Sequence, residues 1–128
     1  MCGISGIYSK SDNLDNILNK FNECLINRGP DNSSIYIEKR NFFGMGHTRL
    51  SILDLSNRGN QPMYDHSGDW VISFNGEIYN HLEIREKILK KLNNIKIEWK
   101  GFSDTETILM ANFIFGFEEM LKILDGMF

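Results

Sequence analysis

The chain has 128 residues, a formal net charge of −3 and 41% hydrophobic residues, which predict one globular domain, or part of one, with an ordinary core. Its densest basic cluster, within residues 83–91, mixes Arg85 and three lysines with two glutamates; it indicates a solvated helix face and gives little support to nucleic-acid binding. The longest apolar run, 108–115, is too short to cross a membrane, and no leader opens the chain, so we expect a cytoplasmic protein without a membrane partner.

The first half of the chain predicts one strand, one helix and then further strands. Apolar spacing indicates a buried strand over 2–8 and an amphipathic helix over 14–25, with Cys24 on its core-facing side. The glycine and proline in residues 28–31 end this helix. Period-two alternation then predicts strands around 35–37, over 42–50 and over 70–74.

The second half predicts helices separated by extended segments. Asn75-Gly76 breaks the preceding strand, either as a hairpin turn with a return strand over 77–79 or as part of a site. A helix is expected from Asn80, as its capping residue, to Leu92, followed by a strand over 95–99.

A capping-box pattern from Ser103 to Glu106 predicts a helix to about Phe115, with a short helix over 117–124 after Gly116. Mixed strands with helices between them predict an α+β layered fold rather than alternating βαβ units.

Cys2 is the first candidate for chemistry. If Met1 is removed, Cys2 carries a thiol and a free α-amino group on one carbon, so a nucleophile and its base stand side by side. An α-amino group titrates near ~7.7–8.0 and a free thiol near ~8.5, so proton transfer between them costs little. Taken alone, Cys2 is better explained as a small buried residue at the start of a strand; the remaining motifs favour the nucleophile.

Three further clusters suit an amino-acid substrate. Arg49 interrupts an apolar strand pattern, where it either grips a carboxylate with two parallel hydrogen bonds or lies at a sheet edge and faces water. The Asn75 amide and the Gly76 N–H are two neutral donors suited to a developing oxyanion. Asp104 either binds an ammonium group or lies in the favourable first turn of a helix. For residues 28–31 we expect a structural role.

Other chemistries have no motif in the sequence. There is no dinucleotide-binding or phosphate-loop pattern and no serine in a nucleophile elbow. The cysteines and the three histidines show no metal-ligand spacing. We therefore expect no metal and no organic cofactor in this chain.

Six segments in this order closely resemble the class II glutamine amidotransferases, in particular the glutaminase domain of glutamine-hydrolysing asparagine synthetases. The resemblance runs from Cys2 to Phe128 and rests on these motifs: Met1-Cys2-Gly3-Ile4, Arg28-Gly29-Pro30-Asp31, His47-Thr48-Arg49-Leu50-Ser51, Gly59-Asn60-Gln61-Pro62-Met63, Phe74-Asn75-Gly76-Glu77-Ile78-Tyr79-Asn80 and Ser103-Asp104-Thr105-Glu106. It implies the αββα sandwich of an N-terminal-nucleophile hydrolase, in which Cys2 attacks the side-chain amide of glutamine and releases ammonia through a thioester.

The resemblance also assigns roles to the other candidates. Arg49 would hold the carboxylate of glutamine, and Asn75 and Gly76 would form the oxyanion hole. The α-amino group would be received by Glu77 and Asp104. Contacts of backbone or wall to the ligand would come from Leu50 and Ile52.

In this family further strands and an ATP-binding synthetase domain follow, and ATP and Mg²⁺ are expected only there. Residues 1–128 are therefore expected to be a glutaminase domain that is incomplete at its C-terminal end, whose open sheet edge favours a homo-oligomer. The alternatives are an inactive binding or regulatory module with the same fold, a hydrolase of another amide, and an amidotransferase to another acceptor in sugar or secondary-metabolite biosynthesis.

Overall fold

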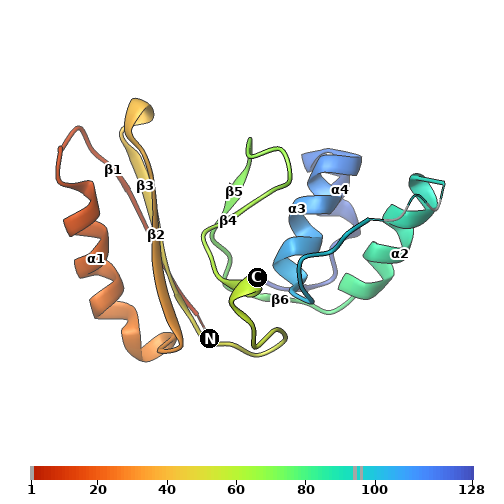
Figure 1. Ribbon diagram of the computed structural model, residues 1–128, viewed down its shortest axis with the longest axis horizontal. Coiled ribbons are helices and arrows are strands. Elements are labelled where there is room, and N and C mark those ends of the chain that lie inside the picture. Colours follow the sequence, from red (N-terminus) through yellow and green to blue (C-terminus); the bar gives the residue numbers. More distant parts are fainter. Residues whose placement is uncertain (1, 94, 96) are drawn as a thin grey trace.

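The computed structural model describes residues 2–93, 95 and 97–128. From left to right, Figure 1 shows a helix, a three-stranded sheet, short strand pairs and a group of helices. The helices of the described ranges are α1 (Leu14–Leu25), α2 (His81–Lys91), α3 (Asp104–Phe115) and α4 (Phe117–Ile123). The strands are β1 (Gly3–Tyr8), β2 (Asn32–Glu38), β3 (Phe43–Arg49), β4 (Met63–Tyr64), β5 (Val71–Ile72), β6 (Glu77–Ile78) and β7 (Gly126–Met127). The α+β class predicted from the sequence is confirmed.

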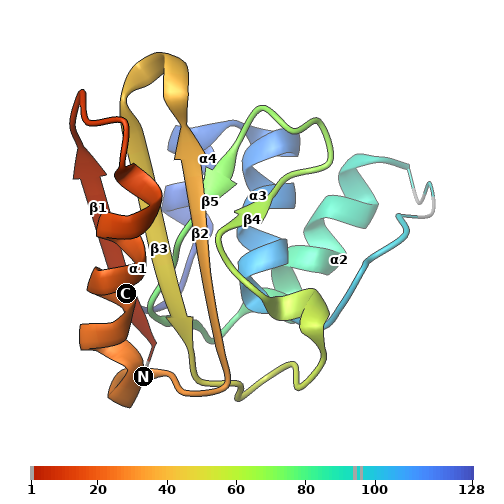
Figure 2. The ribbon, with the colours of Figure 1, turned by 60° about the vertical axis from the view of Figure 1, so that its left-hand side comes forward.

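The larger sheet has β3 at its centre, paired antiparallel with β1 on one side and β2 on the other. One face of this sheet is covered by α1 (Figure 2), whose Leu14 and Leu18 are buried. Gly44 permits the close contact, because a Cβ there would lie 2.6 Å from Cδ1 of Leu18. The opposite face of the sheet is directed toward the short strands and helices α2, α3 and α4 (Figure 1).

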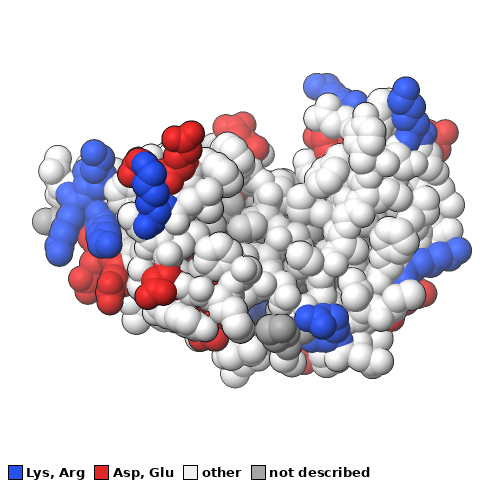
Figure 3. All heavy atoms as spheres, turned by 180° about the vertical axis from the view of Figure 1, so that it is seen from behind, with Lys and Arg blue, Asp and Glu red and all other residues white. Residues whose placement is uncertain are grey.

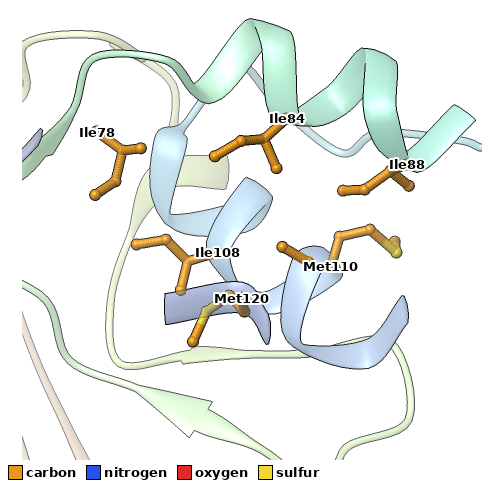
Figure 4. Packing of buried hydrophobic residues seen from close by; sticks show 7 residues of the cluster. Ile78, Ile84, Ile88, Ile108, Met110 and Met120 are labelled. Atoms are coloured by element: carbon orange, nitrogen blue, oxygen red, sulfur yellow. The ribbon is translucent and has the colours of Figure 1, made fainter. Parts of the chain in front are cut away.

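A second apolar core fills the helical layer (Figure 4). Buried side chains from β6, α2, α3 and α4 meet there, and they include Ile78, Ile84, Ile88, Ile108, Met110, Ala111 and Met120. Burial of an aliphatic or methionine side chain contributes roughly 1.5–3 kcal/mol each, so this cluster fixes where α3 begins relative to β6.

Among the described residues, no helix combines the length and apolar character that crossing a membrane requires.

The short strands exclude the hairpin turn, which was one of the two interpretations of Asn75-Gly76. β5 pairs with β4, and β6 pairs with β7, so the strands on either side of Asn75-Gly76 have different partners. The chain continues through this point instead of reversing. Neither β4 nor β7 was predicted, because two-residue strands carry no detectable alternation.

The strand expected over 95–99 is also wrong for the residues that the structure describes. Residues 95 and 97–99 have no regular secondary structure, and Lys96 lies outside the described residues. Ile97 and Trp99 lie on the same side of the segment because both pack against the helical core. These two side chains are therefore half-buried without a neighbouring strand, whereas Ile95, the third apolar residue of the predicted strand, is exposed.

Two predictions of side-chain exposure fail on the helices. Cys24 is exposed, because the side of α1 that meets the sheet carries Leu18 and Asn22, and two residues along a helix turn a side chain by about 200°. Arg85 is 9% exposed and lies 3.9 Å from the centre of the Trp99 ring. It is therefore part of a packed layer, although the lysines of α2 remain outside.

Charged side chains gather toward the two ends of the face drawn in Figure 3, while the middle of that face carries few. At α3 the predicted N-cap is confirmed, since the Ser103 hydroxyl accepts a hydrogen bond from the Thr105 N–H. The full capping box does not form, because the Glu106 carboxylate accepts from the Lys100 and Gly101 N–H groups. At α2, Asn80 stands at the N-cap position without a capping bond. Its amide instead donates to the Ile123 carbonyl.

Candidate functional site

Strand register places Cys2 and Arg49 side by side. In the β1–β3 pair Gly3 is opposite Thr48, so one further residue brings Cys2 opposite Arg49. A Cβ at Gly3 would lie 2.9 Å from Cβ of Leu25 in α1, and the Thr48 hydroxyl donates to the Leu25 carbonyl at 3.1 Å. Because successive residues of a strand face opposite sides, Cys2 and Arg49 both face away from α1.

The Cys2 backbone and thiol are held by two neighbouring segments. The Leu50 N–H donates to Cys2 Sγ at 3.4 Å, and the Cys2 thiol donates to the Leu50 carbonyl oxygen at 3.7 Å. Arg28 Nε donates to the Cys2 carbonyl at 3.1 Å, and Asp31 accepts from the Ser51 N–H at 2.7 Å. The 28–31 turn, expected to be structural, thus lies directly against the first strand.

Arg49 is not the solvent-facing edge residue of the alternative interpretation. It ends the central strand, and the residue is 6% exposed. Nη1 donates to the Ser56 carbonyl at 2.7 Å and to Asn60 Oδ1 at 2.9 Å, and Nη2 donates to the Asp54 carbonyl. A guanidinium has five N–H donors. Three are therefore engaged by the 54–60 loop, and the other two make no hydrogen bond to a described residue.

Gly59 completes the environment of this guanidinium. A Cβ at position 59 would lie 2.2 Å from Arg49 Nη2, so any larger residue there would displace the guanidinium from its present position. The same reasoning applies at Gly76, where a Cβ would lie 2.5 Å from the Met127 carbonyl oxygen. Both glycines are needed for backbone approach.

Side chains, not a sheet ladder, hold the segment that carries Asn75. Gln61 Oε1 accepts from the Phe74 N–H at 2.6 Å, and His47 Nε2 lies 3.2 Å from the Phe74 carbonyl oxygen. Since that oxygen can only accept, Nε2 of His47 carries the proton. The Asn75 side-chain amide makes no hydrogen bond to another described residue, so its donors are available.

Asp104 opens α3 and is 6% exposed. Its Oδ2 accepts from the Ile78 N–H at 2.9 Å, and its Oδ1 accepts from the Thr105 N–H at 2.8 Å. These bonds fix the carboxylate against β6. Glu77 is exposed at the start of the same strand.

One cavity brings all the candidates together. Every residue proposed from the sequence lines it: Cys2, Arg49, Leu50, Ile52, Asn75, Gly76, Glu77 and Asp104. Further lining residues had no assigned role: Leu53, Asp54, Gly59, Gln61, Phe74, Ser103, Thr105 and Met127. Asp54 had a recognisable signal, an acid two residues before a serine, which is typical of an Asx turn, and its carboxylate does accept from the Ser56 N–H. Within the described ranges no three histidine, cysteine or acidic residues cluster as metal ligands.

Acidification is expected to lower the free energy of unfolding, and His47 and Asp54 are two of the groups responsible. Burial lowers the pKa of His47 below its usual 6.5, against the opposing effect of the Phe74 carbonyl. Between pH 6.5 and the lower pKa of the folded state, His47 is protonated in the unfolded chain but not in the folded one. The free energy of unfolding therefore falls as the pH drops through this range. The hydrogen bond from Ser56 lowers the pKa of Asp54 below 3.8, so stability gained above 3.8 is lost at lower pH.

Urea unfolding at about pH 7 and about pH 5 tests the contribution of His47. His47→Gln retains an N–H donor for the Phe74 carbonyl without titrating, so it should lose less stability over this interval than the unmodified protein. His66→Gln, at an exposed histidine, is the matched control. An unchanged pH dependence in His47→Gln would contradict the assignment.

Comparison with known proteins identifies the family. The family described as "Glutamine amidotransferase domain" matches residues 1–128. The putative asparagine synthetase [glutamine-hydrolyzing] 2 of Methanocaldococcus jannaschii is 38% identical over 144 residues, covering 99% of this chain and 26% of that protein. Asparagine synthetase [glutamine-hydrolyzing] 1 of Bacillus subtilis is 34% identical and covers 100% of this chain.

The probable asparagine synthetase [glutamine-hydrolyzing] of Schizosaccharomyces pombe is 36% identical and likewise covers 100% of this chain. The chain spans between 20% and 26% of the length of these three relatives. It therefore belongs to the glutamine amidotransferase domain family, as a class II domain related to those of the glutamine-hydrolysing asparagine synthetases.

Proposed function

We propose that this chain hydrolyses glutamine to glutamate and ammonia, with Cys2 as the nucleophile. Membership of the family implies that the chain binds glutamine. The observation that carries the proposal is the shared cavity, into which the thiol of Cys2, the cation of Arg49 and the acid of Asp104 converge with the Asn75-Gly76 donors. A zwitterionic amino acid with a reactive amide needs this set of groups.

In the proposed reaction Cys2 Sγ attacks the side-chain amide carbon of glutamine after removal of Met1. The thiol proton passes to the α-amino group of Cys2 and then to the leaving nitrogen, which departs as ammonia. The resulting thioester is attacked by water, and glutamate leaves as the thiol is restored. The reaction consumes only glutamine and water.

Substrate recognition is divided between the two ends of the amino acid. The two remaining donors of Arg49 bind the carboxylate as a fork, and Asp104 with Glu77 receives the ammonium group. Leu50 and Ile52 supply wall or backbone contacts beside Arg49. The oxyanion formed by attack is stabilised by the Asn75 amide and the Gly76 N–H, a kind of interaction whose loss costs about 10²–10³ in kcat.

The whole protein's activity follows as a wider proposal. Residues 1–128 act as the glutaminase unit, with the αββα layering of an N-terminal-nucleophile hydrolase, and its ammonia serves asparagine synthesis from aspartate and ATP. ATP and Mg²⁺ would bind in a synthetase domain outside these residues. The names of the asparagine synthetase relatives support asparagine synthesis as the use of this ammonia, and a cytoplasmic location is part of the same proposal.

An assay for ammonia and glutamate, with glutamine as substrate, tests this function. Stoichiometric release of both supports hydrolysis. Glutamine binding without ammonia release would instead favour the inactive-module alternative.

Placing one residue ahead of Cys2 is expected to abolish hydrolysis. In a variant with alanine inserted between Met1 and Cys2, removal of Met1 leaves the nucleophile inside a peptide. The α-amine then moves to the alanine, and the amide nitrogen on Cys2 is not a base. The N-terminal sequence and the rate of ammonia release should be measured together; turnover by a protein that begins with alanine would contradict the role of the amine.

A further inference from the structure

One buried amide joins the two halves of the glutamine site. Gln61 is 6% exposed, and both ends of its side chain are engaged. Oε1 accepts from the Phe74 N–H at 2.6 Å, and Nε2 donates to the Thr105 hydroxyl at 3.1 Å. The two contacts lie on segments 31 residues apart, as the difference between 105 and 74 gives.

Each contact is one residue from a proposed substrate-binding group. Phe74 precedes Asn75, whose amide is assigned to the oxyanion. Thr105 follows Asp104, and the Thr105 N–H donates to Asp104 Oδ1 at 2.8 Å. Gln61 thus reaches toward the reacting end of glutamine with one atom and toward its ammonium end with the other.

The backbone around Asn75 depends on this support. β5 ends at Ile72 and β6 begins at Glu77, so residues 73–76 have no strand partner in the described ranges. The Phe74 peptide groups are held by Gln61 and His47 instead. Loss of either brace leaves a backbone group unsatisfied and the segment free to shift.

We infer that Gln61 is a positioning residue that couples the two ends of the substrate site, because its amide fixes the Asn75 segment and the first turn of α3 with respect to each other. This inference rests on the proposed function. Glutamine has a limited reach, so its ammonium and amide groups meet both subsites only when the distance between the two subsites stays within that reach. Misplacement by about 1 Å can reduce a rate about 10²-fold.

Steady-state hydrolysis by three variants tests the coupling. Gln61→Met is similar in size but removes both bonds, and kcat should fall by about 10- to 100-fold. Thr105→Val removes only the contact on the Asp104 side, so KM should rise by about fivefold while kcat changes little. Thr105→Ser retains the hydroxyl and should restore KM.

Asn22→Leu is the matched control for general destabilisation. Asn22 is 2% exposed and its amide donates to Ser33 and Ser34 on the far side of the sheet. This variant should lower Tm while keeping kcat. An equal loss of kcat in Asn22→Leu and Gln61→Met would overturn the inference, as would wild-type kcat in Gln61→Met.

If Gln61→Met does not fold, the threonine pair decides: equal KM values for Thr105→Val and Thr105→Ser would overturn the coupling. The proposed function fails separately, and this inference with it, if the unsubstituted protein releases no ammonia and its Cys2 is not alkylated by a glutamine analogue. If the unsubstituted protein is active and the variants have its kcat and KM, only the inference about Gln61 is overturned.

Discussion

Replacing Cys2 with alanine is expected to reduce glutamine hydrolysis by about 10⁴-fold or more, the order of loss seen when a covalent nucleophile is removed. No other described group in the cavity carries both a nucleophile and a base on one carbon. The exchange removes one sulfur at the end of a strand, so Tm should change little. Ammonia release and thermal unfolding of the same preparation measure both effects.

Cys24→Ala is the control, because Cys24 is the other free thiol and lies exposed on α1. It should retain the full rate. Appreciable turnover by Cys2→Ala, or an equal loss in both variants, would contradict the assignment of the nucleophile.

Arg49→Lys is expected to raise KM for glutamine by about 10- to 100-fold, the equivalent of losing a hydrogen bond between charged groups. Lysine keeps the charge but offers a single ammonium group in place of a planar fork. Lysine can replace only some of the three hydrogen bonds that the guanidinium donates to the 54–60 loop. Binding of the carboxylate and order in this loop should therefore both decrease.

Steady-state kinetics should show a larger change in KM than in kcat, since Arg49 is proposed to bind the carboxylate and not the amide that reacts. Arg40→Lys, at an exposed position beside β2, is the matched control and should leave both constants unchanged. A KM equal to that of the unsubstituted protein would remove Arg49 from substrate binding.

The sequence predicted long elements well because their periodicity depends on burial against one partner. The helix over 14–25 and the strand over 42–50 correspond closely to α1 and β3. The strand predicted over 95–99 was wrong because Ile97 and Trp99 pack against the helical core without pairing with a strand, while Ile95 is exposed. Asn75-Gly76 favoured a hairpin because local preference does not report the partners of distant strands.

The candidate site was predictable where chemistry requires an unusual residue. An arginine within an apolar strand and a cysteine after the initiator both stand out, and each lines the cavity. The supporting residues do not stand out. Gln61 lies within a family motif and Asp54 within an Asx-turn pattern, but neither signal assigns a role in the site, which follows from contacts with segments far along the chain. Only the folded structure brings these contacts into view.

The most direct test is the intact mass of the protein after incubation with 6-diazo-5-oxonorleucine, an electrophilic analogue of glutamine, followed by mapping of the modified peptide. We predict a protein without Met1 that carries one adduct, located on Cys2, and protection by excess glutamine. A protein that lacks Met1 yet remains unmodified, or an adduct on Cys24 in its place, would contradict an N-terminal thiol acting on bound glutamine.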